Sequence, residues 1–247
     1  MMLFEGILLG IAIGAVLAIV GAGGAILAVP GLIAVMGLGA TAATTSSLVI
    51  VGAAAVAGFI PRIKKQQVNI KLGIVFSALG VLGTYLGTLL VAEVSEVITV
   101  SIFAVLMFAA AFSVWRGQVA ESEVLKKPNW LLVILVASLI GLITGFLGIG
   151  GGFLIVPALV LILKVPTKIA VGTSLVAIAT NTLIALGFRY EFWNLIPIES
   201  ITAFTLAAVL ASLLLAPIAT KLPSKTIQKT FALIVVFVAI YMLVGLI

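Results

Sequence analysis

The sequence predicts an all-α polytopic membrane protein built from two duplicated halves. The chain has 247 residues, of which 64% are hydrophobic and only 8% are charged, and its mean hydropathy is +1.47. A soluble domain carries about 25% charged residues, so this chain has too few charges for a water-facing surface. Apolar runs long enough to cross the hydrocarbon core recur along its length. The short alternating segments of a transmembrane barrel are absent.

One segment occurs twice. The string GAGGAILAVP at residues 21–30 recurs as GIGGGFLIVP at residues 148–157, which is 127 positions later. The same offset aligns Ser47 with Ser174 and the residues around them. We therefore divide the chain into a first membrane repeat at 1–115, a polar linker at 116–129 and a second membrane repeat at 130–247.

Each half contains five apolar runs, which we expect to be helices. In the first half they cover residues 3–20, 25–36, 41–61, 71–92 and 97–115. In the second half they cover residues 130–147, 152–163, 168–188, 198–219 and 225–246. The second run of each half is shorter than the roughly 20 residues that a crossing needs. Either the first two runs of each half form a glycine-tipped helical hairpin, or the short run lies along one membrane surface after a plain crossing.

The distribution of basic residues favours the hairpins. With re-entrant hairpins, each half crosses the membrane three further times and the two halves are inverted. One face then collects 12 of the 13 cations and the other collects only Arg189, whereas parallel halves with four crossings each give 8 against 5. Cytoplasmic loops are rich in Lys and Arg, so we expect inverted halves, a cytoplasmic linker at 116–129 and both termini outside. The net charge of +6 thus orients the chain and does not indicate nucleic-acid binding.

The glycine clusters are the first candidate binding elements. Gly23, Gly24 and Ala25 open the short run of the first half, and their counterparts Gly150, Gly151 and Gly152 open that of the second. A helix N-terminus exposes unpaired N–H groups and a partial positive charge, and glycines let an anion come close to them. We expect the two tips to meet near the bilayer centre in one anion site. The alternative is a packing turn without a ligand. A dinucleotide site is excluded because no strand precedes either cluster and no acidic residue follows.

Hydroxyl side chains open the next helix of each half. They include Thr45, Ser46 and Ser47 in the first half and Thr173 and Ser174 in the second. Hydroxyls donate to anions, but they also cap helices or bond to neighbouring helices. Asn181 lies further along the second helix, where the first half has alanine, so it either contacts substrate or bridges helices.

Other chemistry lacks the residues that it needs. The chain contains no cysteine or histidine, and its acidic residues fall near the ends of the apolar runs. We therefore expect no metal site, no cofactor, no carboxylate proton relay and no enzymatic activity. Arg62 and Arg189 occupy equivalent places in the two halves, where they either guide anions or anchor the topology. Glycines at four-residue spacing, such as Gly6, Gly10 and Gly14, predict close helix packing.

The paired strings GAGGAILAVPGLI and GIGGGFLIVPALV, with the helix starts TAATTSSLVIV and TKIAVGTSLVAI, resemble the TauE/SafE sulfite exporter family over essentially the whole chain. The resemblance implies a secondary transporter for sulfite, organosulfonates or related small anions, embedded in the cell membrane. Export of an anion from an inside-negative cell is favoured by about 2.3 kcal/mol per charge per 100 mV, so no coupled proton is required, although sodium coupling stays open. An anion channel and a non-transporting membrane scaffold are the alternatives.

Overall fold

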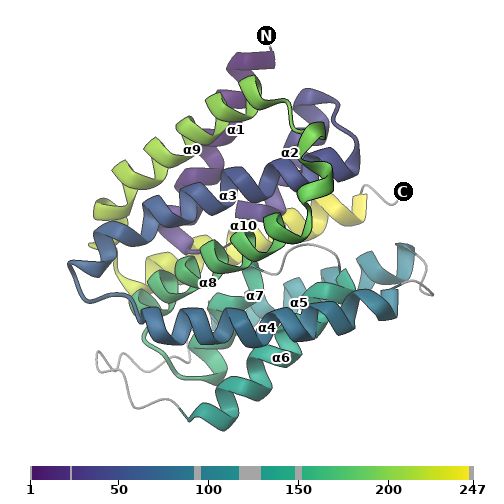
Figure 1. Ribbon diagram of the computed structural model, residues 1–247. Helices are drawn as coiled ribbons and strands as arrows, with labels where there is room; N and C mark the ends of the chain where they lie inside the picture. Colours follow the sequence, from purple (N-terminus) through teal and green to yellow (C-terminus); the bar gives the residue numbers. More distant parts are fainter. Residues whose placement is uncertain (1, 23, 92–95, 117–128, 148–151, 245–247) are drawn as a thin grey trace.

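Every described element in the computed structural model of this chain is a helix (Figure 1). The structure describes residues 2–22, 24–91, 96–116, 129–147 and 152–244. The first half contains α1 (Met2–Val20), α2 (Gly24–Met36), α3 (Ala40–Ile63), α4 (Ile70–Val91) and α5 (Glu96–Trp115). The second half contains α6 (Trp130–Leu147), α7 (Gly152–Pro157), the π-helix η1 (Ala158–Ile162), α8 (Thr167–Phe188), the 3-10 helix η2 (Tyr190–Leu195), α9 (Ile198–Ala219) and α10 (Ser224–Val244).

The apolar runs predict these helices to within two residues, apart from two local features. The second short run is divided, because the α-helix ends at Pro157 and the chain continues as a π-helix in which the Leu163 N–H bonds Ala158 O at 3.1 Å. Proline lacks an N–H and crowds the preceding turn, yet Pro30 lies inside α2 without ending it. The 3-10 helix η2 falls in a segment for which no helix was expected.

The helices α3 and α8 form an antiparallel pair in the middle of the molecule (Figure 1). A Cβ atom built on Gly52 would lie 2.6 Å from Thr182 Oγ1, and one built on Gly58 would lie 3.2 Å from Leu175. Later residues of α3 therefore meet earlier residues of α8. Among the described residues, α3, α8 and α9 are the three helices that are long and apolar enough to span a membrane by length and composition.

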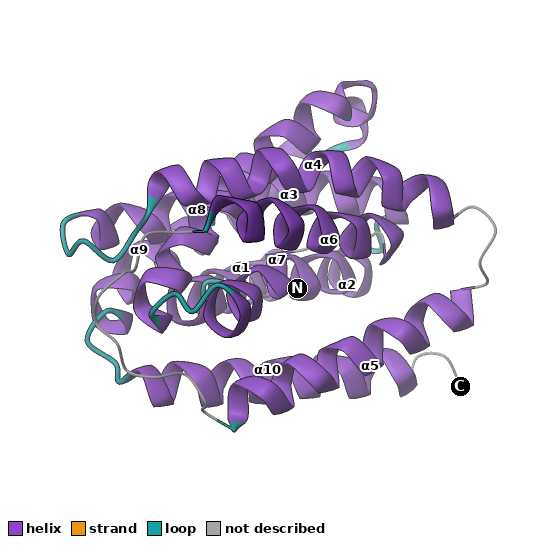
Figure 2. Cartoon of the chain, turned by 90° about the horizontal axis from the view of Figure 1, so that it is seen from below, coloured by secondary structure: helices purple, strands orange, loops and turns teal. Residues whose placement is uncertain are grey.

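The outer helices pair across the two halves. α1 packs along α9, and α4 packs along α6. α5 packs along α10, at the lower edge of Figure 2. Glycines allow these close approaches: a Cβ atom on Gly14 would lie 2.1 Å from Ala208 O, and one on Gly83 would lie 2.2 Å from Ser138 O. The prediction that spaced glycines pack helices is confirmed at these positions.

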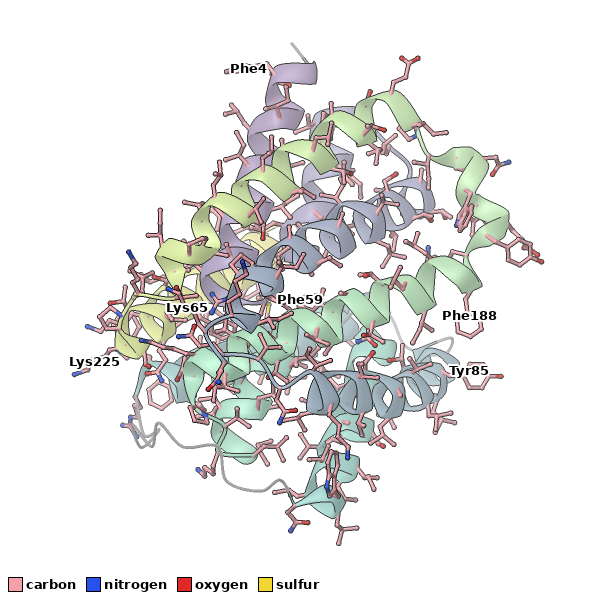
Figure 3. All side chains as sticks on the ribbon, turned by 60° about the vertical axis from the view of Figure 1, so that its left-hand side comes forward. Phe4, Phe59, Lys65, Tyr85, Phe188 and Lys225 are labelled. Atoms are coloured by element: carbon pink, nitrogen blue, oxygen red, sulfur yellow. The ribbon has the colours of Figure 1, made fainter. Side chains whose placement is uncertain are left out.

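Charged and aromatic side chains mark opposite ends of the helix bundle. We define the basic end by the exposed residues Lys64, Lys65, Lys221 and Lys225, and the aromatic end by the exposed residues Tyr85, Phe188, Tyr190 and Trp193. Figure 3 shows Lys65 and Lys225 on one side of the bundle and Phe188 and Tyr85 on the opposite side. Aromatic rings are not confined to the aromatic end, since Lys71 lies over the ring of Trp130 and Lys229 over that of Trp115. Exposed aromatic rings at both ends and cations gathered at one end are typical of a membrane protein.

Gly14→Ala tests the close packing of α1 on α9. We expect this variant to lose about 1–3 kcal/mol of stability, because the added methyl group meets a backbone carbonyl that cannot move away cheaply. The measurement is the melting temperature of the purified protein in detergent. Gly187→Ala is the matched control, since nothing lies within 4 Å of its added Cβ atom. Equal melting temperatures for the two variants would contradict this packing.

Candidate functional site

The first glycine turn joins α1 to α2. Gly21 donates its N–H to Leu17 O at 2.9 Å and has a φ of +70°, which glycine adopts without strain. From there α2 runs back along α1, because a Cβ atom on Gly24 would lie 2.7 Å from Leu17, and one on Gly31 would lie 2.5 Å from Leu9. The chain therefore reverses direction at this turn.

The first glycine turn docks on α8 of the other half. Ser174 Oγ donates to Gly21 O at 2.6 Å and also lies 2.8 Å from Val171 O. A Cβ atom on Gly21 would lie 2.6 Å from Val171 O and 2.8 Å from Ser174 Oγ. Glycine is therefore required here for space as well as for its backbone angle. The contact joins a glycine motif of the first half to a hydroxyl predicted from the second.

Two further predicted residues of α8 bond to the first half. Thr173 is fully buried, and its Oγ1 accepts a 3.0 Å hydrogen bond from the Asn69 N–H, just before α4. Asn181 Oδ1 accepts a hydrogen bond from Ser77 Oγ on α4. Asn181 therefore bridges helices, which was one of its two expected roles. Gly152 opens α7 and faces Ile178 of α8, which would lie 3.2 Å from an added Cβ atom.

The hydroxyls at the start of α3 are mostly turned onto the helix itself. Thr45 Oγ1 donates to Thr41 O at 2.8 Å, and Ser47 Oγ donates to Thr44 O at 2.7 Å. Neither caps the helix, whose N-cap position has no side-chain hydrogen bond. Ser46 differs from them, because it is fully buried and its hydroxyl has no hydrogen-bond partner in the described ranges of the chain.

The structure separates the two hydroxyl clusters. Ser174 lies beside Leu175, which is level with Gly58 of α3, and Ser47 lies eleven residues before Gly58. At 1.5 Å per residue the clusters are about 16 Å apart along the helix pair.

The short helices α2 and α7, which begin near the two glycine clusters, do contact each other. Gly24 and Ala25 lie in the first turn of α2. Gly23, Gly150 and Gly151 lie outside the described residues, so a joint anion site at the two tips stays a prediction.

Arg62 is the polar residue whose environment the sequence did not reveal. It lies in the last turn of α3 and is fully buried. Its Nη2 donates to Ala18 O at 2.6 Å, three residues before Gly21. Its Nε and Nη1 have no hydrogen-bond partner in the described part of the chain. A buried cation with free donors therefore lies beside the end of α1. The signal in the sequence was its equivalence to Arg189, a second arginine that directly follows an apolar run.

Arg189 lies at the other end of the central pair. It follows α8 and is half-buried, and its Nη1 lies 3.5 Å from Thr45 Oγ1 on α3. Each arginine thus ends one central helix close to the start of the other, because α3 and α8 are antiparallel. Guanidinium groups bind oxyanions through parallel N–H donors.

The described residues include no group of three side chains suited to holding a metal ion.

Apolar helices of spanning length, a basic end and polar groups buried between helices define a polytopic membrane protein. The profile described as sulfite exporter TauE/SafE matches residues 6–242. Two proteins of Xylella fastidiosa, from strains 9a5c and Temecula1, are both named "Probable membrane transporter protein". Each is 32% identical to this chain over 238 residues, which are 94% of this chain and 91% of the relative. No solved structure matches the chain. The chain belongs to the sulfite exporter TauE/SafE family, a family of membrane transporters.

Gly21→Asn tests the docking of the first glycine turn. Asparagine tolerates a positive φ, so the expected loss of stability comes from the clash with Val171 O and Ser174 Oγ. We expect a melting temperature several degrees below that of the wild type. Gly37→Asn is the matched control, because Gly37 has a φ of +63° and open space around its added Cβ atom. If both variants melt alike, the contact between the two halves contributes no stability.

Proposed function

We propose that this protein is a secondary transporter that exports small anions, of the sulfite, organosulfonate or carboxylate class, across the cell membrane. One observation carries the proposal: the buried guanidinium of Arg62 keeps two nitrogen atoms without a partner among the residues that the structure describes. The family supports the same substrate class, because its description names a sulfite exporter.

The energetics of Arg62 favour an anionic ligand. Burying a charged group without a counter-charge costs several kcal/mol. The carbonyl of Ala18 supplies a single acceptor for one nitrogen. A small oxyanion would supply both the missing negative charge and several acceptor oxygens, and charge-assisted hydrogen bonds are about twice as strong as neutral ones. The site therefore gains most from a ligand with a compact negative charge.

We propose further that the two halves are inverted repeats. Equivalent helices, α3 and α8, run antiparallel, and the pairing of α1 with α9 mirrors that of α6 with α4. Both features are expected for a two-fold axis in the membrane plane. In this arrangement α1 and α2 form a re-entrant hairpin, the basic end and linker 116–129 face the cytoplasm, and both termini lie outside.

The predicted site residues have a place in this scheme. In the proposal, the glycine tips at Gly23–Gly24 and Gly150–Gly152 bind the anion through backbone N–H groups. Ser46 adds a hydroxyl that has no partner among the described residues. An anion leaving an inside-negative cell gains about 2.3 kcal/mol per charge per 100 mV. Arg62 lies near the basic end, where a cytoplasmic anion would enter. Export therefore needs no coupled cation.

Arg62→Gln tests the proposed function directly. We expect sulfite efflux from proteoliposomes to fall at least about tenfold, because one charge-assisted contact contributes about 1.5–3 kcal/mol. Arg62→Lys keeps the charge but loses the planar donor pair, so we expect intermediate flux. Lys64→Gln is the control, since it removes an equal charge from an exposed position two residues away. Equal flux in the Arg62→Gln and Lys64→Gln variants would overturn the role of Arg62.

Two measurements separate this function from its alternatives. Saturable flux with counterflow indicates a carrier, whereas current proportional to voltage indicates a channel. A thermal-shift screen with sulfite, sulfate, sulfoacetate, taurine and simple carboxylates identifies the ligand class, because a ligand that binds the folded state raises its stability. A scaffold would show neither flux nor a selective shift.

A further inference from the structure

We propose that a second anion-binding site lies at the aromatic end of the α3–α8 pair, formed by Arg189 and Ser46 on either side of Thr45. This inference rests on the proposed function and adds a second binding site to the path of the same anion. We call the sites at Arg62 and at Arg189 the two stations. Arg189 lies near Thr45, which is 17 residues before Arg62 on α3. The two stations are therefore about 25 Å apart along the helix, close to the thickness of the hydrocarbon core.

The guanidinium of Arg189 has donors to spare. Its Nη1 approaches Thr45 Oγ1 at 3.5 Å, which is longer than an ordinary hydrogen bond. The nearest acidic residue in the sequence, Glu191, accepts a hydrogen bond from Tyr190 through Oε1 at 3.3 Å. No ion pair to Arg189 is found within the described residues. The half-buried cation is thus open to an external anion.

Ser46 provides an independent indication of a ligand. It is fully buried, and its hydroxyl finds no hydrogen-bond partner within the part of the chain that the structure describes. Its counterpart Thr173 accepts the N–H of Asn69, the residue just before α4. The residue just before α9 is Pro197, which has no N–H to donate. The hydroxyl of Thr173 in the second half therefore has a backbone N–H partner, whereas the equivalent partner of Ser46 in the first half is missing because proline replaces it.

The same comparison places Ser46 on the side of Arg189. Thr173 faces the segment that precedes α4, so by repeat equivalence Ser46 faces the segment that precedes α9. That segment begins with η2, directly after Arg189, and η2 contacts α3. The uncapped start of α3 adds a partial positive charge nearby. A guanidinium, a free hydroxyl and a positive helix end together suit a sulfite, sulfonate or carboxylate group.

The test measures the two stations separately, with sulfite as the probe. The first measurement is a thermal-shift titration of purified protein in detergent. We expect sulfite to raise the melting temperature of the Arg62→Gln variant as well, but only at higher sulfite concentrations than the wild type needs. Adding Arg189→Gln or Ser46→Ala in the same chain should abolish that remaining shift. As single variants, Arg189→Gln and Ser46→Ala should raise the half-saturating sulfite concentration on the aromatic-end side at least about tenfold. The half-saturating concentration on the basic-end side should stay unchanged.

Matched controls distinguish the two proposals. Thr202→Ala removes an exposed hydroxyl near the start of α9 that only bonds Ile198 O, and Lys225→Gln removes an exposed charge at the basic end. Variants must melt like the wild type, and Arg189→Lys should restore part of the affinity. If Arg62→Gln abolishes flux while Arg189→Gln and Ser46→Ala behave like these controls, the second station is wrong and the proposed function stands. If the wild type neither transports nor binds any tested anion, both proposals fail.

Discussion

The antiparallel contact between α3 and α8 sets the positions of the two arginines that end these helices. Because the two helices are equivalent in the duplicated sequence but run in opposite directions, equivalent residues fall at opposite ends of the pair. Arg62 therefore lies at the basic end and Arg189 at the aromatic end. The outer pairs α1–α9 and α4–α6 pack around the α3–α8 pair, and each of them joins a helix of one half to a helix of the other.

Equivalent hydroxyl positions in the two halves differ in their hydrogen bonding. In the α8–α4 contact, Thr173 bonds Asn69 and Asn181 bonds Ser77. In the α3–α9 contact, Ser212 Oγ donates to Ala54 O, whereas the hydroxyl of Ser46 has no partner among the described residues. An unpaired polar group in an apolar interior is costly. The proposed anion site would supply the hydroxyl of Ser46 with the partner that it lacks among the described residues.

Much of the fold was predictable because a membrane imposes a simple requirement. A helix must be apolar for about 20 residues to cross the hydrocarbon core, so hydropathy alone located the helices. The glycine ladder of Gly6, Gly10 and Gly14 likewise predicted a close helix contact, since only small residues permit it. The π-helix after Pro157 and the 3-10 helix after Arg189 were not predicted, because local hydrogen-bond register leaves no clear mark in hydropathy.

The sequence by itself determined the helical class and the identity of the polar residues, since both depend on composition and on short-range pattern. Only the tertiary structure decided which of those polar residues meet. Gly21 and Ser174 are 153 positions apart, and Arg62 and Ala18 are 44 positions apart. Such contacts depend on how the helices pack, and many helix arrangements are compatible with the same apolar runs. For that reason Arg62 was visible as a cation in the sequence, but its burial beside α1 was not.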